Sequence, residues 1–399
     1  MRFIFLFFIS VNVYALSFDE AAKSISKHDT ILYLDAQSKM LKEDASINGS
    51  WGDSVLKLSA KNFPKKTLKD NETPMTGVEL GVSQKISLTT KYLNKKRSSL
   101  SMSKSVELSR DDQVNKMLTY LWEILILDRK VNEEIELLNE NLSWINKNLK
   151  VTKKLYANGK TSQQALLEIQ IRKSEIESEI SNKNFEKSQI KDRLNFLISK
   201  DQQADIEKET IPWKLLSNLN IDKINLKHLA LKEKVKASEY NLTASKLNYV
   251  PDLTFSVGYT KRSNIDGRGD FVGAQIQIPL PTSSVKYSTH SKAIQQKYMS
   301  LKELTLYEKE KLRDTSILQK EIRKLKEELK ILKDKTISFA RNSRAITAKS
   351  YGIGNANYIE LLQSEFKLQN ILKHKIMLEA QRDIKAVSLI YILGGKLHE

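Results

Sequence analysis

The side chains that could bind a metal ion or act as nucleophiles are scattered along this chain. Cysteine is absent from all 399 residues, which excludes disulfides, thiolate metal sites and cysteine nucleophiles. The histidines include no pair spaced four residues apart, and the seven methionines form no cluster. The histidines are His28, His228, His290, His374 and His398. The sequence therefore predicts no metal site, no cofactor and no enzyme.

One tripeptide, Gly159-Lys160-Thr161, has the residue types that end a phosphate-binding loop. Such a loop also needs a glycine at position 154 and a preceding strand, because its backbone N–H groups wrap the phosphates. Position 154 is Lys154, and helical periodicity precedes it. We therefore reject a nucleotide site.

The segment around this tripeptide occurs twice, 195 residues apart. Lys154-Leu-Tyr156-Ala-Asn-Gly159, followed by Leu166-Leu167-Glu168, corresponds to Lys349-Ser-Tyr351-Gly-Ile-Gly354, followed by Leu361-Leu362-Gln363. Each copy lies between a long helical run and a second run of about 38 residues, so the repeated unit is a helical hairpin with its tip. Each half of such a chain need not bury its hydrophobic face by itself, because that face can pack against the other half or against another copy of the chain.

Ahead of each hairpin, apolar and polar residues alternate with the period of a strand that has two unlike faces. In the first half the alternation covers residues 78–88 and, more weakly, 56–60. In the second half it covers residues 253–260 and 272–280. Helical periodicity precedes these pairs at residues 18–48, where Ser17 and Glu20 form a capping box, and at about 223–249.

Two very long helical stretches follow the strands, at roughly residues 91–156 and 288–351. Sixty-odd residues give a helix on the order of 95 Å long. Apolar residues in the later part of each stretch step alternately by four and three, which indicates a left-handed supercoil. The predicted seams are Val131, Ile135, Leu138, Leu142, Ile145, Leu149, Thr152 and Tyr156, and Leu318, Ile322, Leu325, Leu329, Leu332, Thr336 and Phe339.

These elements divide the chain into a targeting segment, two repeats and a connection. Residues 1–15 have a basic start, an apolar run of 11 residues and a small-residue cleavage site that ends at Ala15. This pattern predicts a cleaved signal peptide and export rather than a membrane-spanning helix, because the run is too short to span a bilayer. The absence of cysteine predicts no lipid anchor on an N-terminal Cys. The first repeat covers residues 16–199, the connection 200–222 and the second repeat 223–399.

The overall composition narrows the class of protein. The formal net charge is +18, which can indicate nucleic acid or anionic lipid as a partner. Here lysine and glutamate interleave, as in residues 321–330, in the manner of solvated helices, so nucleic acid is not expected. The 29% of charged residues excludes a bundle of hydrophobic membrane helices, and 13 glycines are too few for a compact all-β protein.

The strand pairs and the long helices favour a membrane assembly of several chains. A strand pair with an apolar outer face is unstable alone in water, and in a bilayer it must close its hydrogen-bonding edges. Single-chain barrels begin at about eight strands, so four strands need other copies. Nearly all of the mature chain resembles the outer-membrane efflux protein family, the TolC-like channels. The resemblance rests on the combination of strand pairs with long helices, on the two tips and on Gln277-Ile-Pro-Leu280.

The resemblance implies an α+β membrane protein in the outer membrane of a Gram-negative bacterium. Three copies would form one shared β-barrel from four strands each, and the coiled-coil hairpins would continue it as a periplasmic tunnel. Such a homotrimer is the passive exit duct of a tripartite efflux or type I secretion system. Its partners would be a periplasmic adaptor (membrane fusion) protein and an inner-membrane pump of the RND or ABC type.

The resemblance also implies functional positions. The adaptor would dock at the tips, where glycine permits the positive φ of a sharp turn: Asn158, Gly159, Lys160, Thr161, Ile353, Gly354, Asn355 and Ala356. The family's narrow mouth carries acidic residues after the second tip. Here Glu360 matches the first of them, Gln363 replaces the second, and Glu168 corresponds to Gln363 in the first repeat. Three copies of Glu360 would repel one another and favour cations, but one acidic ring does not support strong selectivity.

Lipid contact would belong to one face of the strands and water to the other. The lipid-facing set is Val78, Leu80, Val82, Leu253, Phe255, Val257, Tyr259, Ile276 and Ile278. The water-facing set includes Ser83, Lys85, Thr254, Ser256, Gln275 and Gln277. The alternative interpretation is a periplasmic structural or adaptor coiled coil without a pore. An autonomous general porin conflicts with the helix content.

Overall fold

The computed structural model describes residues 14–199, 204–216, 225–280 and 282–398. The chain divides into two compact units. A helical unit contains the residues up to Leu32, Asp111–Leu226 and Lys309–Glu399, and a strand-bearing unit contains Tyr33–Arg110 and Lys227–Glu308. Each unit takes segments from both repeats, so the repeats are interleaved. Residues 1–13 of the predicted signal peptide and much of the predicted connection lie outside the described residues.

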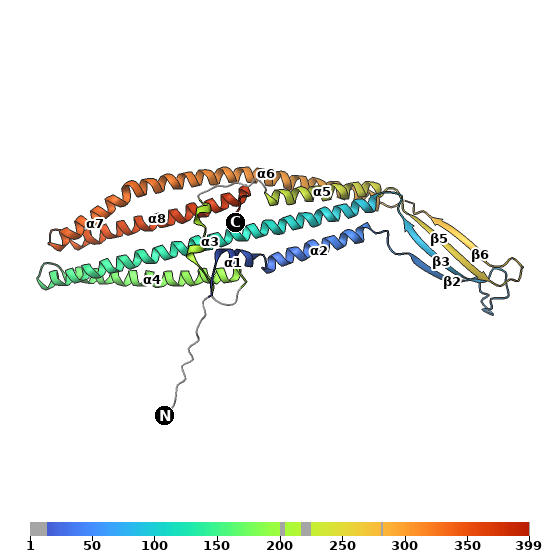
Figure 1. Ribbon diagram of the computed structural model, residues 1–399, viewed down its shortest axis with the longest axis horizontal. Helices are drawn as coiled ribbons and strands as arrows, with labels where there is room; N and C mark the ends of the chain where they lie inside the picture. Colours follow the sequence, from blue (N-terminus) through green and yellow to red (C-terminus); the bar gives the residue numbers. More distant parts are fainter. Residues whose placement is uncertain (1–13, 200–203, 217–224, 281, 399) are drawn as a thin grey trace, which may run out of the picture. The chain divides into compact units, whose positions relative to one another are not determined.

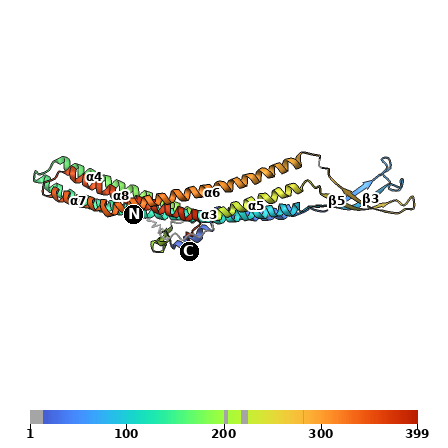
Figure 2. The same cartoon turned by 90° about the horizontal axis from the view of Figure 1, so that it is seen from above.

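Two helical hairpins lie side by side in the helical unit, with their tips at the same end (Figures 1 and 2). The first consists of the later part of α3 (Lys91–Ala157) and α4 (Gln163–Leu197). The second consists of the end of α6 (Val285–Ile331), a π-helical turn (Leu332–Thr336), α7 (Ile337–Gly352) and α8 (Tyr358–Leu393). The smaller elements are β1 (Tyr14–Leu16), paired with β4 (Ala204–Ile206), α1 (Phe18–Ile25) and 3₁₀ turns at Lys208–Thr210 and Trp213–Leu216.

The main apolar core of this unit gathers α1, α3, α4 and the end of α8. Trp122 is fully buried and donates its indole N–H to the Leu397 carbonyl at 2.9 Å. Its ring lies 5.1 Å from that of Phe18. The predicted capping box of Ser17 and Glu20 is present at the start of α1.

The sequence predicts one helical run over residues 18–48, and the structure differs from this prediction. The run forms two helices, α1 and α2 (Asp29–Gly49). The ring nitrogen Nδ1 of His28 accepts a hydrogen bond from the Thr30 N–H at 3.2 Å, which caps the new helix start.

The two predicted heptad seams do not superpose at the 195-residue offset, and a π-helical turn in the second hairpin explains the difference. In α3 the seam holds as far as Thr152, which is fully buried. In the second hairpin the seam holds to Leu332, and the turn at Leu332–Thr336 then rotates the following residues around the helix. Phe339, predicted in the seam, is therefore 69% exposed, and Ala340 is buried instead.

The strand-bearing unit contains a four-stranded antiparallel sheet in the order β2–β3–β5–β6 (Figure 1). The strands are β2 (Val55–Lys61), β3 (Gly77–Ile86), β5 (Leu253–Arg262) and β6 (Phe271–Gln277). The unit also contains α5 (Leu226–Leu247), most of α2 and the first parts of α3 and α6. Small residues join these helices, because Ser98 and Ser105 donate to the carbonyls of Ala237 and Ala230, both at 2.7 Å. No described helix has the length and apolar character needed to cross a membrane.

Candidate functional site

The sheet has one apolar face. Residues directly opposite each other in an antiparallel pair project to the same side. Val82 lies opposite Val257, and Phe255 lies opposite Ile276, so the faces of β3, β5 and β6 are in register. The register brings together every residue of the predicted lipid-facing set that lies within a strand: Val78, Leu80, Val82, Leu253, Phe255, Val257, Tyr259 and Ile276. Ile278 follows the end of β6 and is exposed.

The apolar face is wider than predicted. Leu56 and Leu58 on β2 lie opposite Val82 and Leu80, and Val272 on β6 lies opposite Tyr259. These additional residues are 69%, 72% and 74% exposed, more than any predicted member of the face. The sequence shows the period-two alternation of apolar and polar residues in both strands. The alternation is weaker in β2, because Ala60 is a small apolar residue.

The opposite face is polar. Ser83, Ser256 and Gln275 form one row across the sheet, and Lys85, Thr254 and Gln277 form another. Lys61 and Glu79 form an ion pair on the same face. The predicted water-facing residues therefore share one side, opposite the apolar residues.

Both edges of the sheet are open. β2 and β6 are the outer strands, and neither has a further partner strand in the part of the chain that the structure describes. Open edges are unfavourable in water and are not tolerated in hydrocarbon, where every backbone polar group needs a partner. The sheet thus needs other strands before it can enter a bilayer.

A charged cluster that was not predicted from the sequence joins the sheet to the helices of the same unit. Asp252, just before β5, is 7% exposed. It accepts from Lys91 at 2.7 Å, Lys85 at 3.1 Å and the Tyr92 hydroxyl at 3.0 Å. Burial alone would raise the pKa of Asp252, but these hydrogen bonds outweigh it and hold the pKa below its usual value. A detectable signal existed, because Lys91-Tyr92 recurs as Lys286-Tyr287 at the 195-residue offset.

The two hairpin tips have the same backbone geometry. Gly159 and Gly354 have φ of +68° and +84°. In both, the next N–H returns to the last helical turn, from Lys160 to the Leu155 carbonyl at 2.8 Å and from Asn355 to the Ser350 carbonyl at 2.9 Å. The side chains of Ser162 and Asn357, also 195 residues apart, then cap α4 and α8. The expected tip residues therefore form two matched turns.

The predicted gate residues lie in the first turns of the returning helices. Glu360 is exposed and forms part of a cap, because its N–H and one carboxylate oxygen bond the Asn357 side chain at 2.9 and 3.1 Å. Gln363 is exposed and Glu168 is half-buried. Within one chain these three side chains do not form a cluster of hydrogen bonds or ion pairs.

Polar contacts hold the two hairpins together near their tips. The Tyr351 hydroxyl lies 2.9 Å from Thr152 Oγ1, and both residues are almost fully buried. The Arg172 guanidinium stacks on the Phe366 ring at 4.1 Å, and Lys373 pairs with Glu179. Tyr351 belonged to the recognised tip motif, but its partner could not be identified from the sequence because it lies in the other repeat.

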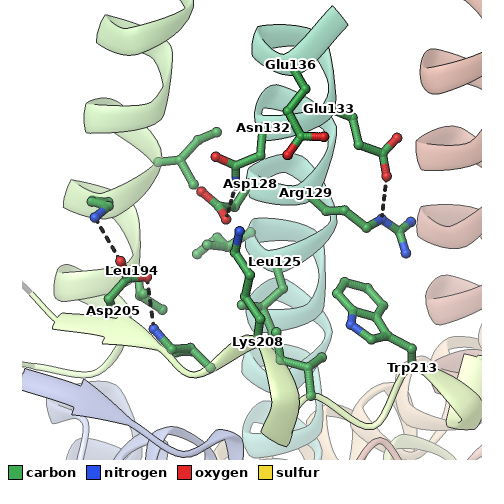
Figure 3. Close-up of a pocket in the computed structure, with 15 residues that line it drawn as sticks. Leu125, Asp128, Arg129, Asn132, Glu133, Glu136, Leu194, Asp205, Lys208 and Trp213 are labelled. Atoms are coloured by element: carbon green, nitrogen blue, oxygen red, sulfur yellow. Dashed lines mark hydrogen bonds and ion pairs between the residues drawn. The ribbon is translucent and has the colours of Figure 1, made fainter.

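A cavity of about 230 Å³ lies farther from the tips, between α3, α4 and the segment around Trp213 (Figure 3). Arg129 extends over the Trp213 ring at 4.3 Å. Burial raises the pKa of Asp128 and of Glu133. Two ion pairs lie among the residues that line this cavity, Lys191 with Asp205 at 2.9 Å and Arg129 with Glu133 at 4.0 Å.

No protein-family model matches the sequence, and no curated protein matches it. Among solved structures, the outer membrane protein VceC from Vibrio cholerae matches with a TM-score of 0.77 at 16% identity, over 95% of this chain and 96% of that chain. CusC, a protein whose structures concern transmembrane channel formation, matches with a TM-score of 0.77 at 12% identity, over 96% and 94%. The CmeC outer membrane channel of Campylobacter jejuni matches with 0.74 at 12%, over 96% and 86%.

These likenesses establish the fold. The chain has the architecture of TolC-like outer-membrane channels over almost its whole length. The predicted combination of long helical hairpins with four strands in two pairs is confirmed.

Proposed function

We propose that this protein is a homotrimeric outer-membrane channel, the passive exit duct of a tripartite efflux or type I secretion system. The observation that carries the proposal is the four-stranded sheet with one apolar face, one polar face and two open edges. Three such sheets, joined edge to edge, close a barrel of twelve strands. Closure gives the backbone N–H and C=O groups of every edge strand a hydrogen-bond partner. It also places the apolar face in lipid and lines a water-filled interior with the polar face.

The helical hairpins serve as the periplasmic part of the duct. Their tips, Asn158–Thr161 and Ile353–Ala356, are exposed turns on rigid helices, and they dock to the hairpins of a periplasmic adaptor protein. The adaptor links the duct to an inner-membrane pump of the RND or ABC type, which supplies the energy. Export to this location uses the predicted signal peptide.

The mouth of the duct opens when the hairpins separate near the tips. Within one chain, separation breaks the Tyr351–Thr152 hydrogen bond and the Arg172–Phe366 stack. Glu360 lies in the first turn after the second tip, and three copies on one axis would select weakly for cations. A passive gate of this kind needs no catalytic group.

Membrane fractionation of cells that express the full chain tests the proposal. We expect the protein in the outer membrane, as a trimer that resists heating in mild detergent. Purified trimers in planar bilayers should give small conductance at rest, because the mouth is closed. A monomer that is soluble without detergent, or one found with the inner membrane, would instead support the structural or adaptor coiled coil.

A further inference from the structure

We propose that the interior of the barrel favours anions, so that the duct carries anionic solutes more readily than cationic ones. This preference rests on the proposed trimeric channel, and it names the class of solute that the barrel selects. The charges on the polar face of the sheet carry it, because that face would line the water-filled interior. A passage lined by one sign of charge raises the local concentration of ions of the opposite sign.

The polar face carries more bases than acids within the four described strands. Its acid is Glu79 on β3, and its bases are Lys57, Lys61, Lys85 and Arg262. Arg262 adds little to the charge of the interior, because it is buried and pairs with Asp266 at 2.7 Å. The lysines therefore decide the sign of the charge on this face.

In the first of two clusters, two lysines share one carboxylate. Lys61 forms an ion pair with Glu79, and the Nζ of Lys57 lies 3.9 Å from the same oxygen, Oε2 of Glu79. The Glu79 side chain is only 16% exposed, whereas the side chains of Lys57 and Lys61 are 55% and 46% exposed. The cluster thus presents one surplus positive charge to the water, because one carboxylate balances only one of the lysines.

A row of glycines explains why this carboxylate can lie low against the sheet. Lys57 lies opposite Gly81, Gly81 lies opposite Gly258, and Gly258 lies opposite Gly273. A Cβ added to Gly258 would meet Oε1 of Glu79 at 2.7 Å. The row therefore makes room for the acid, and it places no other side chain of these strands beside the Lys57 ammonium group.

The second cluster, around Asp252, has the same ratio of charges. Asp252 pairs with Lys91 at 2.7 Å and with Lys85 at 3.1 Å. The side chain of Lys91 is 4% exposed and that of Lys85 is 50% exposed, so the buried lysine balances the acid and the exposed lysine carries the surplus charge. In a trimer, each of the two surplus charges would occur three times around one interior.

The remaining acids near the sheet do not reverse this sign. Asp270, just before β6, accepts a hydrogen bond from the Arg262 N–H at 3.0 Å, and Asp53, before β2, is exposed. Together, the sheet and its connections (residues 53–85 and 252–280) contain more bases than acids. Lysine, arginine, aspartate and glutamate are all charged at neutral pH, so the net charge of this part of the chain is positive.

The ion selectivity of purified trimers in planar bilayers tests the proposal. Reversal potentials under a KCl gradient near about 0.1 M, where screening is moderate, give the permeability ratio of chloride to potassium. We expect a ratio above one. Lys57→Gln and Lys85→Gln should each lower the ratio, because each leaves its carboxylate with a single lysine. The double variant should lower it at least about twofold, since it removes both surplus charges.

Matched variants separate charge from shape and the barrel from the mouth. Lys57→Arg and Lys85→Arg keep the charge and should keep the ratio. Glu79→Gln should raise the ratio, because both lysines of its cluster then lack an acid. Glu360, after the second tip, has the opposite charge, so the lysine substitutions are repeated in Glu360→Gln trimers. Decreases of similar size in both backgrounds would locate the preference in the barrel.

The possible failures point to different conclusions. Conducting trimers whose ratio does not change in the Lys57→Gln and Lys85→Gln double variant would overturn the anion preference alone. A ratio below one in both the unchanged and the Glu360→Gln trimers would do the same. Absence of trimers, or of any conductance, would overturn the proposed function and the preference with it.

Discussion

Gly159 and Gly354 end their helices with the same turn, and the capping residues that follow lie at the same spacing. Three residues earlier the two repeats differ, because Tyr156 is 43% exposed and Tyr351 is 2% exposed. Both tyrosines stand in the same Lys-x-Tyr-x-x-Gly pattern. Short-range sequence therefore sets the turn, whereas the neighbouring repeat decides which tyrosine is buried.

The largest expected effect tests whether the strands of the two repeats are equivalent. Val82 and Val257 lie opposite each other on the apolar face. Val82→Arg and Val257→Arg should each cost about 2–4 kcal/mol if these residues are near the bilayer midplane, and both should reduce the yield of heat-resistant trimers in outer-membrane fractions.

Ser83→Arg and Ser256→Arg are the matched controls on the polar face. They place the same charge one residue away, and we expect trimer yields close to that of the unchanged protein. Unimpaired assembly of the two valine variants would show that the apolar face does not contact lipid.

The tip glycines come next in expected size. Gly159→Ala and Gly354→Ala should each destabilise the helical unit by about 1–2 kcal/mol, because a Cβ is unfavourable at positive φ. An added Cβ would have no atom within 4 Å at either position, so the backbone alone determines the cost. Chemical denaturation followed by circular dichroism measures the change.

Gly352→Ala is the control in the same tip, since Gly352 ends α7 and a Cβ there also has free space. The first repeat already has Ala157 at this position. A small stabilisation is expected there, because alanine favours helix. Equal losses at Gly352 and Gly354 would contradict the assignment of the turn.

The two tyrosines should respond differently to loss of the hydroxyl. Tyr351→Phe removes a buried hydrogen bond, which should cost about 0.5–1.5 kcal/mol. Thr152 still donates to the Asn148 carbonyl, so no donor is left without a partner. Tyr156→Phe should have little effect, because the Tyr156 side chain is 43% exposed. Thermal unfolding of the two variants compares these outcomes, and equal losses would contradict the assignment of the buried hydrogen bond to Tyr351.

Acid should change the stability of the two units in opposite directions, lowering it near Asp252 and raising it near Asp128. The pKa of Asp252 is lowered from 3.8, so its contribution to stability is present above that pH and is lost as the pH falls through the folded-state pKa. The pKa of Asp128 is raised from 3.8 by burial, so the helical unit loses stability as the pH rises from that value through the folded-state pKa. Native-state hydrogen exchange of α3 near Asp128 and of β5, compared between pH 7 and pH 3, would show this contrast. Parallel trends in both units would contradict it.

Periodic features of the sequence predicted most of the fold. The alternation in β3 and β5 places Val82 and Val257 on one face, and the 195-residue offset identifies both tips. The exposed Phe339 could not be predicted, because the π-helical turn before it leaves no mark in the apolar pattern. The cluster around Asp252 was also missed, since its members lie about 160 residues apart and meet only in the folded chain. Gate and docking roles depend on other molecules, so no pattern within one chain determines them.

The smallest effect concerns the far end of the returning helices. Gly394, after α8, has φ of +79°, and its counterpart 195 residues earlier is Ser199, with φ of +52°. Each donates its N–H to the residue three positions back, Tyr391 at 3.0 Å and Phe196 at 3.3 Å. Ser199→Gly should therefore stabilise the chain by roughly 0.5 kcal/mol, because relief of the positive φ exceeds the entropy that glycine adds to the unfolded chain. Gly394→Ser should destabilise it by a similar amount, and the double exchange should be nearly neutral in denaturant titrations. If Ser199→Gly lowers the stability, the serine hydroxyl contributes more than its backbone costs, and the two helix ends are not equivalent.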